Sequence, residues 1–138
     1  MKILITGGSG LLGQYLNLFL SDKHNILTLF HSNMGNCKDY NSLKINICEY
    51  ASLLKIFNDF KPDVVIHTAA NSHPILSEGV SSKDVYELNV NATKNIAEFC
   101  EKFNSKLIYT STDLVYAGYR SSMLKEDAKL VPVSLYAE

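Results

Sequence analysis

Apolar residues recur along this chain in two patterns, as short continuous runs and as stripes spaced three or four residues apart. The continuous runs are rich in β-branched residues and predict strands at residues 2–6, 26–30, 43–47, 64–66 and 106–110. The run Val64-Val65-Ile66 does not alternate with polar residues, as expected of a strand covered by helices on both faces. A largely buried sheet is therefore predicted.

The helix-spaced stripes lie between these runs. Pro62 ends the second predicted helix, and the third is predicted as one long helix over residues 83–103. Residues 121–133 are predicted as loop. Three core-facing stripes are expected, formed by Leu12, Leu16, Phe19 and Leu20; by Leu53, Ile56, Phe57 and Phe60; and by Val85, Leu88, Ala92, Ile96, Phe99 and Phe103.

Strands that alternate with helices predict an α/β fold with a parallel sheet. Because crossover connections are right-handed, the simplest arrangement is a doubly wound sheet with strand order 3-2-1-4-5. A chain of 138 residues, 46% of them hydrophobic, is long enough for one buried core and too short for two. We therefore expect a single domain over residues 1–138.

Three glycines, Gly7, Gly10 and Gly13, are spaced three apart where the first strand gives way to the first helix. A tight turn needs a residue without Cβ, and a diphosphate can approach the backbone only where no side chain intervenes. The start of the helix adds unpaired N–H groups and a partial positive charge. This context favours a dinucleotide-binding turn over an ordinary glycine-rich loop.

The second strand ends near His31, where an NAD-preferring site would carry an acidic residue for the ribose 2′-hydroxyl. No acidic residue occurs between Asp22 and Asp39, so a 2′-phosphate would not be repelled. His31, Ser32 and Asn33 can donate hydrogen bonds to such a phosphate, although no Arg stands beside them to hold it bidentately, and this favours NADP(H) over NAD(H). The alternative for His31 is an exposed loop residue with no ligand.

Composition narrows the choice of partners and compartment. The chain has 13 Lys and Arg against 14 Asp and Glu, a balance that attracts neither nucleic acid nor an anionic membrane. Its first apolar run is too short for a signal peptide or membrane span. The three cysteines fit neither a disulfide framework nor a metal site, so a cytoplasmic protein without metal is expected.

Four segments carry a family resemblance: TGGSGLLG at residues 6–13, PDVVIHTAA at 62–70, LNVNAT at 88–93 and YTSTDLVY at 109–116. They resemble the extended short-chain dehydrogenases, and within them the dTDP-4-dehydrorhamnose reductase branch of nucleotide-sugar enzymes. The first matches the family's TGxxGxxG turn, and the last is similar to the STD-x-VF run of that branch. The resemblance extends over nearly the whole chain and implies a Rossmann-like NAD(P)-binding domain.

The resemblance also implies which residues contact the cofactor. Asn46 and Ile47 take the place of the acidic and apolar residues that the family sets beside the adenine, and Asn retains an acceptor for the adenine amine. The complete implied set is Gly7, Ser9, Gly10, Leu11, Leu12, His31, Ser32, Asn46, Ile47, Ala69, Ala70, Asn71 and Thr110.

For catalysis, family members use a tyrosine as proton donor, a Ser or Thr that hydrogen-bonds the same substrate oxygen, and a lysine four positions after the tyrosine. Tyr136 matches the tyrosine and Thr112 the hydroxyl. The residues alone also allow Tyr136 to be a surface aromatic and Thr112 a turn residue. His67, which ends the fourth strand, is expected to be a packed, hydrogen-bonded core residue rather than a base.

The family's lysine position lies two residues beyond Glu138, and the family's C-terminal substrate domain is not in the chain. We therefore expect the N-terminal fragment of a longer protein, inactive alone. The helix that should begin near Tyr136 would cover the sheet beside the fifth strand. Without it, exposed apolar surface favours either self-association as a homo-oligomer or marginal stability of the chain.

The favoured function is a reductase that transfers hydride from NADPH to a keto group of a nucleotide-linked sugar, as in dTDP-rhamnose biosynthesis. Two alternatives remain open. One is a nucleotide-sugar epimerase or dehydratase on the same scaffold, and the other is a non-catalytic regulatory subunit that keeps the cofactor pocket.

Overall fold

The computed structural model describes residues 1–71, 81–116, 123–132 and 136–137. These residues form two compact units. The described residues of the first unit are 1–71 and 81–110, and those of the second lie from Ser111 onward. Among the described residues of the second unit, Asp113–Tyr116 form a short 3₁₀ turn, η3. Its described residues 123–132 form neither helix nor strand, as predicted, whereas residues 121, 122 and 133 lie outside the described residues.

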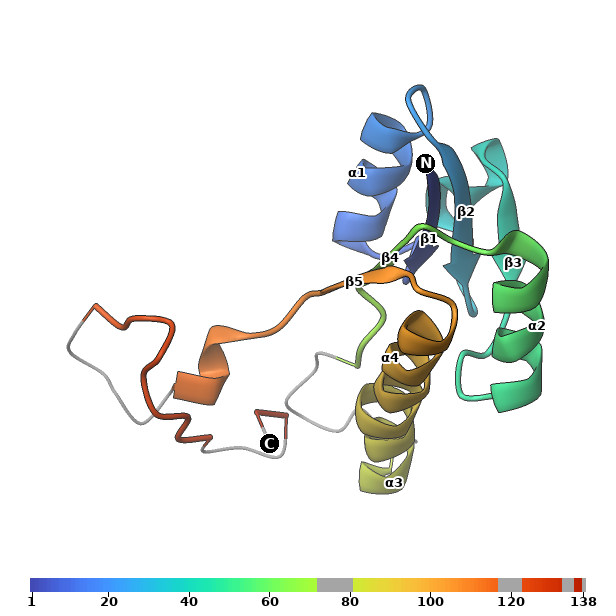
Figure 1. The fold of residues 1–138 in the computed structure, drawn as a ribbon. Coiled ribbons are helices and arrows are strands. Elements are labelled where there is room, and N and C mark those ends of the chain that lie inside the picture. The colour runs from blue at the N-terminus through green and yellow to red at the C-terminus, as the bar shows by residue number, and fades with distance from the viewer. Residues whose placement is uncertain (72–80, 117–122, 133–135, 138) are drawn as a thin grey trace. The chain divides into compact units, whose positions relative to one another are not determined.

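The first unit is built on a five-stranded parallel sheet (Figure 1). The strand order, β3-β2-β1-β4-β5, is the predicted one. The third strand is shorter than predicted because the chain turns away at Asn46, whose Oδ1 accepts a hydrogen bond from the backbone N–H of Cys48. The strands are β1 (Lys2–Thr6), β2 (Asn25–Phe30), β3 (Ser42–Lys44), β4 (Val64–His67) and β5 (Lys106–Tyr109).

Helices cover the two faces of the sheet unequally. Helices α2 (Tyr50–Phe60) and α4 (Ala92–Lys102) pack on one face, where Phe57 and Phe99 are buried with ring centroids 5.3 Å apart. Helix α1 (Leu11–Leu20) lies on the other face with the smaller core around Ile3 and Ile5 (Figure 1). Between β2 and β3 the chain forms one 3₁₀ turn, η1 (Gly35–Asp39).

The long helix predicted over residues 83–103 is a helical run with a π-turn inside it. It consists of α3 (Ser82–Tyr86), the π-turn η2 (Glu87–Asn91) and α4. Within the π-turn, Asn89 accepts a hydrogen bond from the backbone N–H of Asn71 (2.8 Å) and donates one to its carbonyl (3.1 Å). These two bonds tie the π-turn to the chain that leaves β4.

Two predictions about burial were wrong. Leu12 and Phe19 of α1 are 48% and 66% exposed, because the helix turns Gly13 and Asn17 toward the core instead. Along β4, which was expected to be buried on both faces, the burial of the side chains alternates: Val65 and His67 are fully buried, and the other two residues are only partly buried. In the described part of the unit, α2 and α4 cover one face of β4, while α1 lies over β1 and β2 on the other face.

Candidate functional site

The turn after β1 depends on glycine at its first position. Gly7 has a φ of +69°, which L-residues rarely adopt. A Cβ there would lie 2.8 Å from the backbone nitrogen of Ala69, in the segment that follows β4. The turn after β1 therefore lies in direct contact with the chain leaving β4.

The other glycines of the turn differ in what surrounds them. A Cβ on Gly13 would collide with the carbonyl oxygen of Gly7, and one on Gly8 with the Thr28 hydroxyl. Gly10, by contrast, is exposed, and a Cβ there would meet only the carbonyl oxygen of Gly7, at 3.2 Å. Gly13 is thus needed for packing, whereas Gly10 leaves open space beside the backbone.

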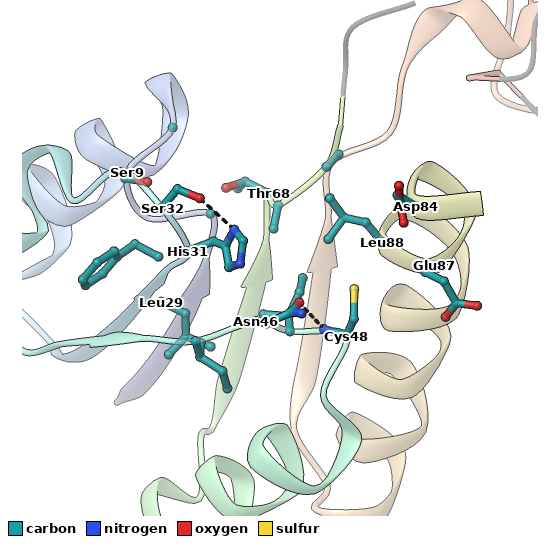
Figure 2. A pocket seen from close by; sticks show the side chains of 17 residues that line it. Ser9, Leu29, His31, Ser32, Asn46, Cys48, Thr68, Asp84, Glu87 and Leu88 are labelled. Carbon is teal, nitrogen blue, oxygen red and sulfur yellow. Dashed lines mark hydrogen bonds between the residues drawn. The ribbon is translucent and has the colours of Figure 1, made fainter. Parts of the chain in front are cut away.

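That open space belongs to a pocket of about 660 Å³ at the carboxyl ends of β1 to β4 (Figure 2). Open α/β sheets bind ligands at this edge, where the strand order reverses. The volume lies within the range of roughly 300–1,000 Å³ typical of small-molecule sites. The pocket is lined by Gly7, Ser9, Gly10, Leu29, Phe30, His31, Ser32, Ile45, Asn46, Ile47, Cys48, Thr68, Ala69, Ala70, Asp84, Glu87 and Leu88.

The pocket brings together most of the cofactor-contacting residues expected from the sequence. Nine of them line it: Gly7, Ser9, Gly10, His31, Ser32, Asn46, Ile47, Ala69 and Ala70. Four others do not. Leu11 and Leu12 are exposed at the start of α1, Asn71 bonds to Asn89, and the Thr110 hydroxyl donates to the carbonyl of His67 (3.0 Å).

Several lining residues were missed by the sequence reasoning. Asp84, Glu87 and Leu88 come from the helical run, and Cys48 and Thr68 follow β3 and β4 (Figure 2). The segment LNVNAT, which resembles a family motif, was a signal from which Leu88 could have been predicted to line the site. Helical periodicity gave no signal for Asp84 and Glu87, which are exposed and look like ordinary surface acids.

Negative side chains and a helix terminus set the charge of the pocket. Among the described residues that line it there is no lysine or arginine, whereas Asp84 and Glu87 are present. Burial, followed by the charges of Glu87 and Asp84, raises the pKa of the Cys48 thiol and keeps it neutral. The first turn of α1 has no acidic residue, and helix geometry leaves the amides of Leu11 and Leu12 without intrahelical acceptors. An anionic group is therefore favoured at the glycine turn rather than beside α3.

The end of β2 presents two polar side chains to the pocket. The hydroxyl of Ser32 and Nδ1 of His31 lie 2.9 Å apart, and both residues are exposed (Figure 2). Since the imidazole has one further nitrogen, His31 retains a group that faces solvent or ligand.

His67 is a buried structural residue, as predicted. Its Nδ1 lies 2.6 Å from the Thr6 hydroxyl and its Nε2 lies 2.9 Å from the Thr93 hydroxyl. Because Thr6 Oγ1 also accepts from the backbone N–H of Ala69 (3.3 Å), we assign its proton to the bond with Nδ1 and the ring proton to Nε2. Burial lowers the pKa of His67 to about 4, so the ring is neutral at physiological pH.

The two residues expected to act in catalysis belong to the second unit. Thr112 Oγ1 accepts a hydrogen bond from the backbone N–H of Leu114 (3.2 Å), the turn role that the sequence left open. Tyr136 is partly buried. Thr112 keeps its own hydroxyl proton, since in that bond it is the acceptor.

Within the described residues, no three His, Cys, Asp or Glu side chains gather as metal ligands would. Among the helices described, none is both long and apolar enough to cross a membrane.

Known proteins match this chain along its whole length. A family model described as RmlD substrate binding domain matches residues 1–138. The dTDP-4-dehydrorhamnose reductase of Aggregatibacter actinomycetemcomitans is 30% identical over 139 residues, which cover 99% of this chain and 43% of that protein. Methionine adenosyltransferase 2 subunit beta of Xenopus tropicalis is 32% identical over 138 residues, covering 99% of this chain and 40% of that protein.

The fold also matches that of a solved structure. The Bordetella bronchiseptica enzyme WbmG in complex with NAD has a TM-score of 0.85 and 26% identity, covering 99% of this chain and 46% of that one. This chain thus spans less than half the length of each of these relatives. Because the family model matches every residue and the strand order is that of the Rossmann-like fold, the chain belongs to the RmlD substrate-binding domain family and has a short-chain dehydrogenase/reductase-like fold.

Proposed function

We propose that this chain is the NAD(P)-binding part of a cytoplasmic reductase that transfers hydride from NADPH to a keto group of a nucleotide-linked sugar. The observation that carries the proposal is the pocket at the carboxyl edge of the sheet, with the open side of Gly10 in one wall and the ends of β2 and β3 in the other. A cytoplasmic setting fits the three cysteines, which are all free thiols.

The lining residues fit the parts of a dinucleotide in order. The diphosphate would lie against Gly7 and Gly10, with the first amides of α1 as donors. His31 and Ser32 would meet the 2′-phosphate of the adenosine ribose. Asn46 and Ile47 would meet the adenine, since Asn46 Oδ1 accepts one bond from Cys48 and has a second lone pair for the adenine amine.

For the chemical step, the bound nicotinamide supplies the hydride, and this chain supplies the groups that act on the carbonyl oxygen. Tyr136 would donate the proton to that oxygen. The hydroxyl of Thr112 would donate a hydrogen bond to the same oxygen while accepting one from Leu114. The similarity to a dTDP-4-dehydrorhamnose reductase supports a keto sugar as substrate, and the residues that bind this sugar would come largely from the longer protein.

A second candidate is a cofactor-binding subunit without catalysis of its own. The match to a protein named as a subunit of methionine adenosyltransferase 2 favours it. The two candidates share the dinucleotide pocket and differ in the role of Tyr136.

Calorimetric titration of the chain with NADPH and with NADH tests the shared part. We expect saturable binding of both, with NADPH tighter. If neither NADPH nor NADH shows detectable binding, the cofactor proposal fails. If NADH binds more tightly than NADPH, the stated preference is reversed. In the full-length protein, loss of NADPH oxidation on Tyr136→Phe would support the reductase over the subunit.

A further inference from the structure

Asn36, in the segment that follows β2, makes three hydrogen bonds to α1, and Asn17 of α1 also contacts Sγ of Cys37 in that segment (3.7 Å). Asn36 donates its backbone N–H to Gln14 Oε1 (3.1 Å) and its side-chain amide to the backbone carbonyl of Gln14 (2.9 Å). Its Oδ1 accepts a hydrogen bond from Nδ2 of Asn17 (2.9 Å). Three hydrogen bonds thus join one residue to two neighbouring turns of α1.

The same two helix residues also bind the glycine turn. Nδ2 of Asn17 donates to the carbonyl of Gly8 (3.0 Å), and Nε2 of Gln14 donates to the carbonyl of Ser9 (3.2 Å). Asn17 is fully buried, and its Oδ1 finds no hydrogen-bond partner among the described residues, so the contribution of this side chain comes from its donations. Gln14, Asn17 and Asn36 therefore connect the glycine turn to the segment after β2; we call these three residues the clasp.

The backbone of that segment is adapted to the close approach. Gly35 has a φ of +52°, and a Cβ there would lie 3.0 Å from Gln14 Oε1 and 3.3 Å from Cβ of Ser9. A side chain at this position would push the segment away from α1 and from the glycine turn. The contact is thus supported by hydrogen bonds and by the missing side chain together.

The segment begins with His31 and Ser32, which line the same pocket as Ser9 (Figure 2). NADPH and NADH differ only at the 2′ position of the adenosine ribose, which dinucleotide folds meet at the end of the second strand. We propose that the clasp is a specificity-determining device: it fixes the distance between the diphosphate turn and the 2′-contacting residues. Its members are positioning residues, and the proposal rests on the dinucleotide pocket proposed above.

The test compares the affinities of NADPH and NADH in matched variants of the chain. Asn36→Ala removes two side-chain bonds of the clasp, whereas the control Asn58→Ala removes one exposed side-chain bond to the carbonyl of Leu54, on α2. For Asn36→Ala we expect NADPH affinity to fall about tenfold, or about 1.4 kcal/mol, with NADH affinity changed less than about twofold. The control should leave both affinities unchanged.

Gln14→Glu provides a second, milder variant should Asn36→Ala fail to fold. It keeps an acceptor for Asn36 and loses the donor to Ser9, so the same selective loss is expected at smaller size. Hydrogen exchange of the ligand-free protein supplies a readout independent of cofactor, with faster exchange of the amides of residues 33–36 expected in Asn36→Ala than in Asn58→Ala.

The outcomes separate this inference from the proposed function. An equal loss of both affinities, or none, in variants that exchange faster at residues 33–36 overturns the clasp and leaves the cofactor proposal intact. Unchanged exchange at these amides also overturns the clasp. If the unaltered chain binds neither dinucleotide, both proposals fail. If it prefers NADH, only the stated preference for NADPH fails. The clasp is then still tested by whether Asn36→Ala changes the two affinities unequally.

Discussion

The hydroxyl oxygen of Thr6 lies 2.6 Å from Nδ1 of His67, and this hydrogen bond joins the end of β1 to the end of β4 beneath the pocket. The opposite ring nitrogen contacts Thr93 of α4, and the ring stacks on Tyr109 of β5 with centroids 5.6 Å apart. One neutral imidazole therefore links three strands and a helix, directly below the residues that line the pocket wall.

This burial predicts a pH dependence of stability. Because burial lowers the pKa of His67 from 6.5 to about 4, the unfolded chain takes up a proton in this range that the folded chain does not. The contribution is fully present above pH 6.5 and is lost as the pH falls toward 4, by up to about 3 kcal/mol. Urea unfolding at several pH values should show a smaller loss in His67→Gln than in the original chain. If the free energy of unfolding fell equally with pH in both proteins, His67 would not be the source of this pH dependence.

Gly10 and Gly13 should respond in opposite ways to alanine. Gly10→Ala places a Cβ 3.2 Å from the carbonyl oxygen of Gly7, at the N-cap of α1, so the free energy of unfolding should fall by about 1 kcal/mol or less while NADPH affinity falls at least about tenfold. Gly13→Ala collides with the backbone of Gly7 and should lower the free energy of unfolding by about 1–3 kcal/mol. Urea unfolding and calorimetric titration measure the two effects. The reverse pattern would argue against a ligand at Gly10.

Asn89 should hold the π-turn against the chain leaving β4. Asn89→Ala removes its bonds to both backbone groups of Asn71, and we expect a loss of about 1–3 kcal/mol in the free energy of unfolding. Asn89→Asp keeps the acceptor for the Asn71 N–H and should cost less. Equal effects of the two variants in urea unfolding would mean that the acceptor contributes nothing.

The exposed apolar side chains of α1 should favour self-association. Leu11, Tyr15 and Phe19 are spaced four apart and are 82%, 56% and 66% exposed. Sedimentation velocity over a range of concentrations should show association that Phe19→Gln weakens. Leu43 of β3 is 45% exposed and lies outside α1, so Leu43→Gln is the matched control and should leave the association unchanged. A monomer at all concentrations would contradict this prediction.

The sequence predicted the sheet better than it predicted the helix faces. All five strands were found: four are apolar runs bounded by turn residues, and the short β3 overlaps the predicted run 43–47 at Leu43 and Lys44. Right-handed crossovers then left few strand orders. The face of α1 was predicted only in part: Leu16 and Leu20 pack on the core as expected, but Leu12 and Phe19 do not. The helix packs instead through Gly13 and through Asn17, whose polarity is offset by the carbonyl of Gly8. Hydrophobic periodicity registers neither a bare backbone contact nor a satisfied polar side chain.

For the site, the turn and strand-end residues were predictable because a parallel sheet brings them to one edge. The clasp and the π-turn were not, because each depends on contacts between residues far apart in sequence, such as Asn36 with Gln14 and Asn71 with Asn89. Asp84 and Glu87 line the pocket only because the helical run is placed beside β4.

The central claim is that the glycine turn after β1 seats the diphosphate of a nicotinamide dinucleotide at the start of α1. Titration of ¹⁵N-labelled chain with NADPH, followed by amide chemical shifts, tests it most directly. We predict the largest shifts at the amides of residues 8–12, with smaller ones at residues 31, 32, 46 and 47. Shifts centred elsewhere on the sheet, or none at saturating NADPH, would contradict the claim.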